Sequence, residues 1–114
     1  MEQHASPKRT ISEETLREIV RRIVEAVAPE KIILFGSAAR GEMGPDSDLD
    51  LLIVKSCENQ RETAWTIRRQ LIGIAIGIPK DVIVVTPEDI ERHKETIGLI
   101  VRPALKEGRV IYAA

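Results

Sequence analysis

The sequence predicts an α/β (α+β) domain in which one small mixed β-sheet of about four strands is covered by helices. Two hydrophobic patterns support this fold class, because helical spacing and short runs of Val, Ile and Leu alternate along the chain. The length of 114 residues fits one domain, and contents of 43% apolar and 31% charged residues are typical of a globular one.

The first predicted helix follows a short polar segment. Residues 1–9 have no apolar core, so we expect a flexible tail and not a signal peptide, with the domain occupying residues 10–114. Thr10 and Glu13 have the spacing of a capping box, and Pro29 ends the helix. Between them, apolar residues recur at helical spacing: Leu16, Ile19, Val20, Ile23, Val24 and Val27.

Two strands are predicted next, at residues 31–35 and 48–55, because both runs are short and rich in Ile, Leu and Val. Between them, residues 36–41 are small and can open a short helix, and residues 42–47 form a loop.

A second helix is predicted to begin near Asn59, with an apolar stripe that continues to Ala75. Gly77 and Pro79 are the expected stop. The isoleucines at 72, 74, 76 and 78 also alternate with period two, which leaves a strand as the alternative at the end of this helix.

The last third of the chain repeats the alternation. Residues 81–86 are a third strand, and residues 86–89 (Thr-Pro-Glu-Asp) combine a cap, a proline and acids at a helix start. We expect this helix to pass Ile97, to be kinked or divided at Pro103 and to end at Gly108, before a last strand at residues 110–112.

Charge and composition exclude several classes of protein. A net charge of -1 argues against binding to duplex nucleic acid, and 3% aromatic residues leave little material for stacking on single strands. No apolar stretch approaches the ~20 residues that cross a bilayer. The single cysteine, Cys57, excludes an internal disulfide and fits the reducing cytoplasm. We therefore expect a cytoplasmic domain that binds a small molecule or another protein.

Aspartates are concentrated at the start of the second strand. The chain has five, and Asp46, Asp48 and Asp50 fall within five residues. Asp48 and Asp50 share one face of a strand, about 7 Å apart, because side chains alternate. Two carboxylates this close favour a divalent cation, and a pair of magnesium ions suits their reach. The alternative is that both acids are simply exposed to solvent, as is usual for an isolated Asp-x-Asp.

Two further features point to a site near these carboxylates. Gly36 and Ser37 directly follow a strand, where a glycine lets the backbone approach a ligand and a helix start favours phosphate, with Arg40 as a further cation. Asp81 precedes a wholly apolar run, although aspartate is rare in strands. Taken alone, each feature can also have an ordinary structural role. Gly36 and Ser37 can form a simple turn, and Asp81 can cap the turn that follows Pro79.

The combined spacing resembles the minimal nucleotidyltransferase (MNT) family of the DNA polymerase beta superfamily. The resemblance covers about residues 15–112. It is carried by Phe-Gly-Ser-Ala-Ala-Arg-Gly at 35–41, Ser-Asp-Leu-Asp-Leu at 47–51, Ile-Pro-Lys-Asp-Val at 78–82 and Gly-Arg-Val-Ile-Tyr at 108–112. It implies a nucleotidyltransferase fold, with no second domain to hold an acceptor.

The resemblance also implies roles for the candidate residues. Asp48 and Asp50 are expected to ligate two Mg2+ ions, and Asp81 to ligate the catalytic one and to help deprotonate the acceptor hydroxyl. Gly36 and Ser37 are expected to hold the triphosphate of ATP. Arg40 is expected to brace that loop or an acid beside it.

Stand-alone members of this family are similar to antitoxins paired with a HEPN ribonuclease toxin. The resemblance implies transfer of AMP from ATP to a tyrosine of such a toxin, with release of pyrophosphate. The alternative is a non-enzymatic antitoxin of the same fold that neutralises its partner by complex formation alone. Three mutually repelling carboxylates favour the enzyme. A transferase for a small molecule is a weaker third reading, because such enzymes usually carry an additional substrate-binding domain.

Other side chains are interpreted structurally. Trp65, Ile72 and Ile76 form a second apolar stripe that is either core or a contact surface, and the core reading is favoured. Arg68 and Arg69 are expected on a solvated helix face, and His4 and His93 in solvent.

Overall fold

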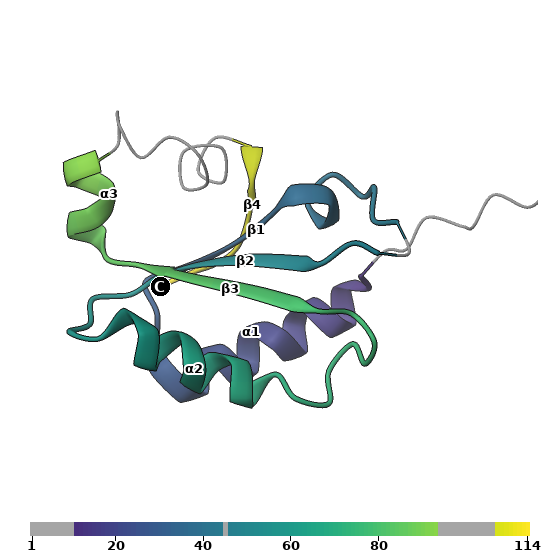
Figure 1. Cartoon of the computed structure of the whole chain (residues 1–114), viewed down its shortest axis with the longest axis horizontal. Coiled ribbons are helices and arrows are strands. Elements are labelled where there is room, and N and C mark those ends of the chain that lie inside the picture. Colours follow the sequence, from purple (N-terminus) through teal and green to yellow (C-terminus); the bar gives the residue numbers. More distant parts are fainter. Residues whose placement is uncertain (1–10, 45, 94–106) are drawn as a thin grey trace, which may run out of the picture.

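The computed structural model describes residues 11–44, 46–93 and 107–114. Its elements, in chain order, are α1 (Glu13–Val27), β1 (Lys31–Phe35), the 3-10 helix η1 (Gly36–Ala38), β2 (Leu49–Val54), α2 (Gln60–Gln70), β3 (Lys80–Val85), α3 (Pro87–His93) and β4 (Arg109–Ala113), as Figure 1 shows. Every predicted strand is present with bounds within one residue of those expected. The expected tail at residues 1–9 lies outside the described residues.

The strands form one mixed sheet in the order β3-β2-β1-β4. β1 is antiparallel to both β2 and β4, whereas β2 and β3 are parallel. Parallel neighbours need a crossover connection, and α2 supplies it between β2 and β3. The prediction of a four-stranded mixed sheet covered by helices is confirmed.

Both faces of the sheet bury apolar side chains. α1 and α2 pack on one face (Figure 1), where β2 contributes Leu49, Leu51 and Ile53. Because side chains alternate along a strand, Asp50, Leu52 and Val54 point to the opposite face. A smaller cluster covers that face, with these buried members: Ile33, Leu52, Val54 and Val85. α3 adds Ile90 to it.

The helix starts follow local capping chemistry. α1 is capped by Ser12, whose Oγ accepts a hydrogen bond from the Thr15 amide at 3.0 Å. The helix thus begins two residues later than the capping box at Thr10 implied, and Thr10 lies outside the described residues. α3 begins as predicted, since the Asp89 amide donates to Thr86 Oγ1 at 3.0 Å. Its expected course past Ile97 and Pro103 also lies outside the described residues.

α2 begins as predicted but ends earlier. The Asn59 side chain accepts from the Glu62 amide at 3.0 Å, yet the helix stops at Gln70 and not near Ala75. Residues 71–78 form turns, so the alternative of a strand at the isoleucines is also wrong. Gly73 (φ +93°) and Gly77 (φ +89°) take left-handed conformations that break both regular patterns.

The expectation that Trp65, Ile72 and Ile76 join the core is wrong. Their exposed fractions are 56%, 74% and 87%. α2 turns Ala64 and Ile67 inward, and Trp65 lies about 100° further round the helix. The Arg69 guanidinium covers part of the indole, 4.8 Å from the ring centroid.

No helix within residues 11–44, 46–93 and 107–114 is long and apolar enough to span a bilayer.

Candidate functional site

The sheet brings two of the predicted aspartates together. Asp50 in β2 and Asp81 in β3 are Cα partners across the parallel pair. Neighbouring strands lie about 4.8 Å apart, and paired residues point to the same face. Asp48 lies just before β2, two residues from Asp50, so the local alternation places it toward the same side. Asp46 lies further out in the loop and is exposed.

The carboxyl group of Asp50 is influenced by burial and by the charges of its two neighbours. The pKa of Asp50 is raised above its ordinary value, first because partial burial disfavours its charged form, then because the negative charges of Asp81 and Asp48 repel it. Asp48 and Asp81 are exposed, whereas Asp50 is half-buried. Such mutual repulsion is typical of a site that a cation neutralises.

Gly36 lies directly against this group. Phe35 is the antiparallel Cα partner of Asp50, so the residue that follows it turns past the Asp50 side chain. A Cβ atom at position 36 would lie 2.3 Å from Asp50 Oδ2, too close for any other side chain to fit without movement. Gly36 also has φ +71°, in the left-handed region that favours glycine. Two independent constraints therefore select glycine here.

The turn after β1 is tighter than the predicted helix start. η1 has only three residues, so it carries almost no macrodipole, and that part of the phosphate argument does not hold. Two features of this turn can still bind a phosphate: the close backbone approach that Gly36 allows, and the hydroxyl group of Ser37. The Ser37 carbonyl accepts bonds from the amides of Arg40 (3.2 Å) and Glu42 (2.9 Å), which close the loop.

Arg40 contacts an acid of its own loop. Its Nε donates to Glu42 Oε1 at 2.8 Å, and both side chains are 53% exposed. This pair joins two residues near the start of the loop between η1 and β2. Within the part of the chain that the structure describes, no hydrogen bond or ion pair joins the Arg40 side chain to Asp48, Asp50 or Asp81.

The carboxylates of Asp48, Asp50 and Asp81 are suitable ligands for a metal ion, although they do not converge on one point. Among the residues that the structure describes, no three His, Cys, Asp or Glu side chains converge tightly enough to hold an ion. Carboxylate oxygens are nevertheless the ligands that Mg2+ prefers. Mg2+ usually keeps several waters and binds one or two carboxylates together with substrate phosphates, so a preformed three-carboxylate cage is not required.

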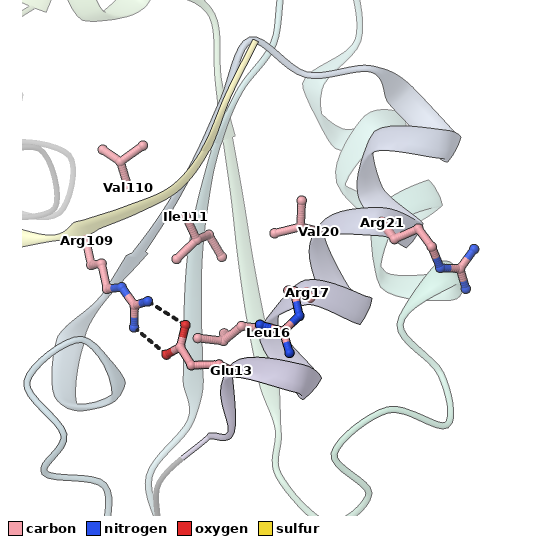
Figure 2. Close-up of a pocket in the computed structure, with 8 residues that line it drawn as sticks. All are labelled: Glu13, Leu16, Arg17, Val20, Arg21, Arg109, Val110 and Ile111. Atoms are coloured by element: carbon pink, nitrogen blue, oxygen red, sulfur yellow. Dashed lines mark hydrogen bonds and ion pairs between the residues drawn. The ribbon is translucent and has the colours of Figure 1, made fainter.

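A cavity of about 390 Å³ lies elsewhere, between α1 and β4. Figure 2 shows Glu13 and Arg109 at its edge, joined by hydrogen bonds of 2.7 and 3.0 Å. Leu16, Val20 and Ile111 contribute apolar lining. None of the predicted site residues lines it, so this hollow is separate from the aspartates.

One contact near the site was not anticipated. Arg68 is exposed, as expected for a solvated helix face, and its Nη2 also donates to the Val82 carbonyl at 3.1 Å, next to Asp81. The sequence carries no signal for this contact, because it depends on how α2 packs along β3. Arg69 is exposed as expected and stacks on Trp65.

Comparison with known proteins agrees with the geometry. A family model described as a nucleotidyltransferase domain matches residues 13–111. A search of curated proteins finds no match.

Solved structures share the fold at low sequence identity. A toxin–antitoxin complex with AMP-PNP matches with 15% identity and a TM-score of 0.65, over 87% of this chain and 73% of that chain. A complex of tri-AMPylated Shewanella oneidensis HEPN toxin with MNT antitoxin matches with 11% identity and a TM-score of 0.62, over 91% and 74%. A candidate nucleotidyltransferase from Sulfolobus solfataricus matches with 22% identity and a TM-score of 0.57, over 88% and 78%.

The fold, the aspartates beside a glycine turn and the match over most of the chain agree with one another. The chain belongs to the nucleotidyltransferase domain family.

Proposed function

We propose that this protein is a Mg2+-dependent nucleotidyltransferase that transfers AMP from ATP to a hydroxyl group of a partner protein. The observation that carries the proposal is the pairing of Asp50 with Asp81 in adjacent strands, with Gly36 against the Asp50 carboxylate. Membership of the nucleotidyltransferase domain family supports the reaction class.

Asp48, Asp50 and Asp81 would hold two Mg2+ ions. When bound, the ions would stabilise the negative charge of the attacking and leaving oxygens. The raised pKa of Asp50 supports this role, because burial and the charges of Asp81 and Asp48 disfavour its ionised form, which a nearby cation would stabilise.

The transfer exchanges one phosphorus–oxygen bond for another. The acceptor oxygen forms a bond to the α-phosphorus of ATP, and the bond from that phosphorus to pyrophosphate breaks. The hydroxyl proton passes to the carboxylate of Asp81, which is exposed and can meet an acceptor on another molecule. Gly36 and Ser37 would receive the triphosphate, because a glycine backbone without Cβ allows close approach.

A HEPN-type toxin is the proposed acceptor, with a tyrosine as the modified residue. The support is the fold shared with chains of toxin–antitoxin complexes, one of which holds AMP-PNP and another a tri-AMPylated HEPN toxin. The reaction is proposed to take place in the cytoplasm, where ATP and Mg2+ are available. The protein would then act as an antitoxin by covalent modification.

A transfer assay tests this proposal. The protein is incubated with α-labelled ATP, Mg2+ and a HEPN-type toxin, and both chains are examined for label and the solution for pyrophosphate. We expect label on the toxin in the wild-type reaction, and none with the Asp48→Asn, Asp50→Asn double variant. A double variant that still neutralises the toxin fully, with no label in either reaction, would support the alternative of a non-enzymatic antitoxin.

A further inference from the structure

Asp81 lies on β3, an edge strand of the described sheet. A neighbouring strand holds the backbone of an edge strand on one side, so other contacts must fix its position on the other side. Among the residues that the structure describes, β3 pairs only with β2, so one side of its backbone faces no other described strand. On the inner side, the Leu49 amide donates to the Pro79 carbonyl at 2.8 Å and the Lys55 amide to the Val85 carbonyl at 2.9 Å. Residues 79 and 85 therefore direct their carbonyls toward β2.

Carbonyls of alternate residues point to the outer side of a strand, and two side chains of α2 bind them. Arg68 Nη2 donates to the Val82 carbonyl at 3.1 Å, and Gln60 Nε2 donates to the Val84 carbonyl at 3.0 Å. α2 packs along β3 in Figure 1, which brings both side chains to this edge. These two bonds satisfy carbonyls on the side of β3 that no described strand covers.

The two bonds differ in their distance from the site. Val82 directly follows Asp81, whereas Val84 lies three residues beyond it. We propose that Arg68 is a positioning residue: by holding the Val82 carbonyl, it fixes the backbone that presents Asp81 to the metal and the acceptor. This inference rests on the proposed function, because it assigns Arg68 a role in the same site.

A second contact secures the segment on the other side of Asp81. Lys80 donates from Nζ to the carbonyls of Ala75 (3.2 Å) and Ile78 (2.9 Å), and partial burial lowers the pKa of its ammonium group. These bonds tie the turns at 71–78 to the first residue of β3. Lys80 and Arg68 thus hold the chain immediately before and after Asp81.

Arg68→Met removes the guanidinium and keeps much of the aliphatic stem. Residues that support a metal ligand typically contribute 10- to 100-fold to metal affinity or activity, and we expect a loss of about this size in kcat. At saturating Mg2+ the KM for ATP should stay nearly unchanged, because Gly36 and Ser37 are not disturbed. Arg68→Lys retains a cationic donor and should recover much of the lost rate.

Gln60→Met is the control, because it removes a bond to a carbonyl of the same edge, and with it a second bond to Asp89 Oδ2 at 2.9 Å. We expect it to lower the melting temperature at least as much as Arg68→Met, while kcat stays close to that of the wild type. Each variant is also titrated with Mn2+ in the presence of AMP-PNP, with the free ion followed by electron paramagnetic resonance. This measurement reports on the site without turnover, and only Arg68→Met should bind Mn2+ more weakly.

The outcomes separate this inference from the proposed function. Equal kcat and equal Mn2+ affinity in the two methionine variants would overturn the role of Arg68 and leave the reaction intact. Absence of transfer by the wild type, with Mn2+ binding weakened only in Arg68→Met, would overturn the reaction and support the positioning role. If Arg68→Met does not fold, Arg68→Gln, whose shorter neutral side chain also loses the bond to the Val82 carbonyl, takes its place, and Mn2+ binding equal to that of Gln60→Met and the wild type counts against the inference.

Discussion

Gly36→Ala is the substitution for which the structure makes the sharpest prediction. The added Cβ would lie 2.3 Å from Asp50 Oδ2, whereas real Cβ atoms essentially never approach within 3.0 Å. The methyl group or the carboxylate must therefore move by about 0.7 Å or more. Displacement of a site group by about 1 Å can cost around 100-fold in rate, so we expect transfer to fall about 10- to 100-fold.

Backbone strain adds a loss of stability. Gly36 has φ +71°, and a residue with a Cβ pays about 1–2 kcal/mol in the left-handed region. In a domain of this size, each 1 kcal/mol corresponds to a shift of about 4 °C in melting temperature. We therefore expect Gly36→Ala to melt at least about 4 °C below the wild type.

Gly41→Ala is the matched control. Gly41 has φ +68°, nearly the same as Gly36, but a Cβ there would meet nothing within 4 Å. Both variants should lose similar stability, and only Gly36→Ala should lose transfer activity. The assay is single-turnover transfer at saturating ATP and Mg2+, beside a thermal melt. Equal activity in the two variants would refute the argument that the Gly36 contact sets the position of the Asp50 carboxylate.

Three further predictions concern the carboxylates. Asp81→Asn should lower the rate of single-turnover transfer by about 100-fold or more, because it removes the proton acceptor. ATP binding, measured by calorimetry, should weaken far less. A transfer rate within threefold of the wild type would exclude Asp81 from the reaction. Asp50→Asn should melt at a higher temperature than the wild type at pH 7 in EDTA. The reason is that the pKa of Asp50 is raised, so its ionisation destabilises the fold as the pH rises through that pKa. The difference in melting temperature should vanish toward pH 3, and a lower melting temperature of the variant at pH 7 would contradict this prediction. Removal of Mg2+ by EDTA should weaken ATP binding strongly, and equal affinity with and without the ion would contradict the metal site.

Much of the fold could be predicted because the local signals agree with the tertiary structure. β1, β2 and β3 are short runs of branched apolar residues, and Thr86 and Asn59 cap their helices as expected. The end of α2 could not be predicted, because the isoleucines between 72 and 78 satisfy helix and strand periods equally. The left-handed glycines decide the outcome by ending the helix in turns.

The sequence predicted that the candidate residues lie near one another, but it did not predict the contacts around them. The spacing of Gly36, Asp48, Asp50 and Asp81 indicated one constellation, and the register pairs Asp50 with Asp81. The exposure of Trp65 and the bond from Arg68 to Val82 depend on how α2 rotates and packs along β3. Periodicity within one helix does not contain that information.

A crystal structure with Mn2+ and AMP-PNP tests the central claim most directly. Anomalous scattering locates Mn2+ independently of the protein model. We predict anomalous density at the carboxylates of Asp48, Asp50 and Asp81, with the triphosphate against Gly36 and Ser37. Mn2+ and nucleotide bound away from these aspartates, for example in the cavity between α1 and β4, would contradict the account.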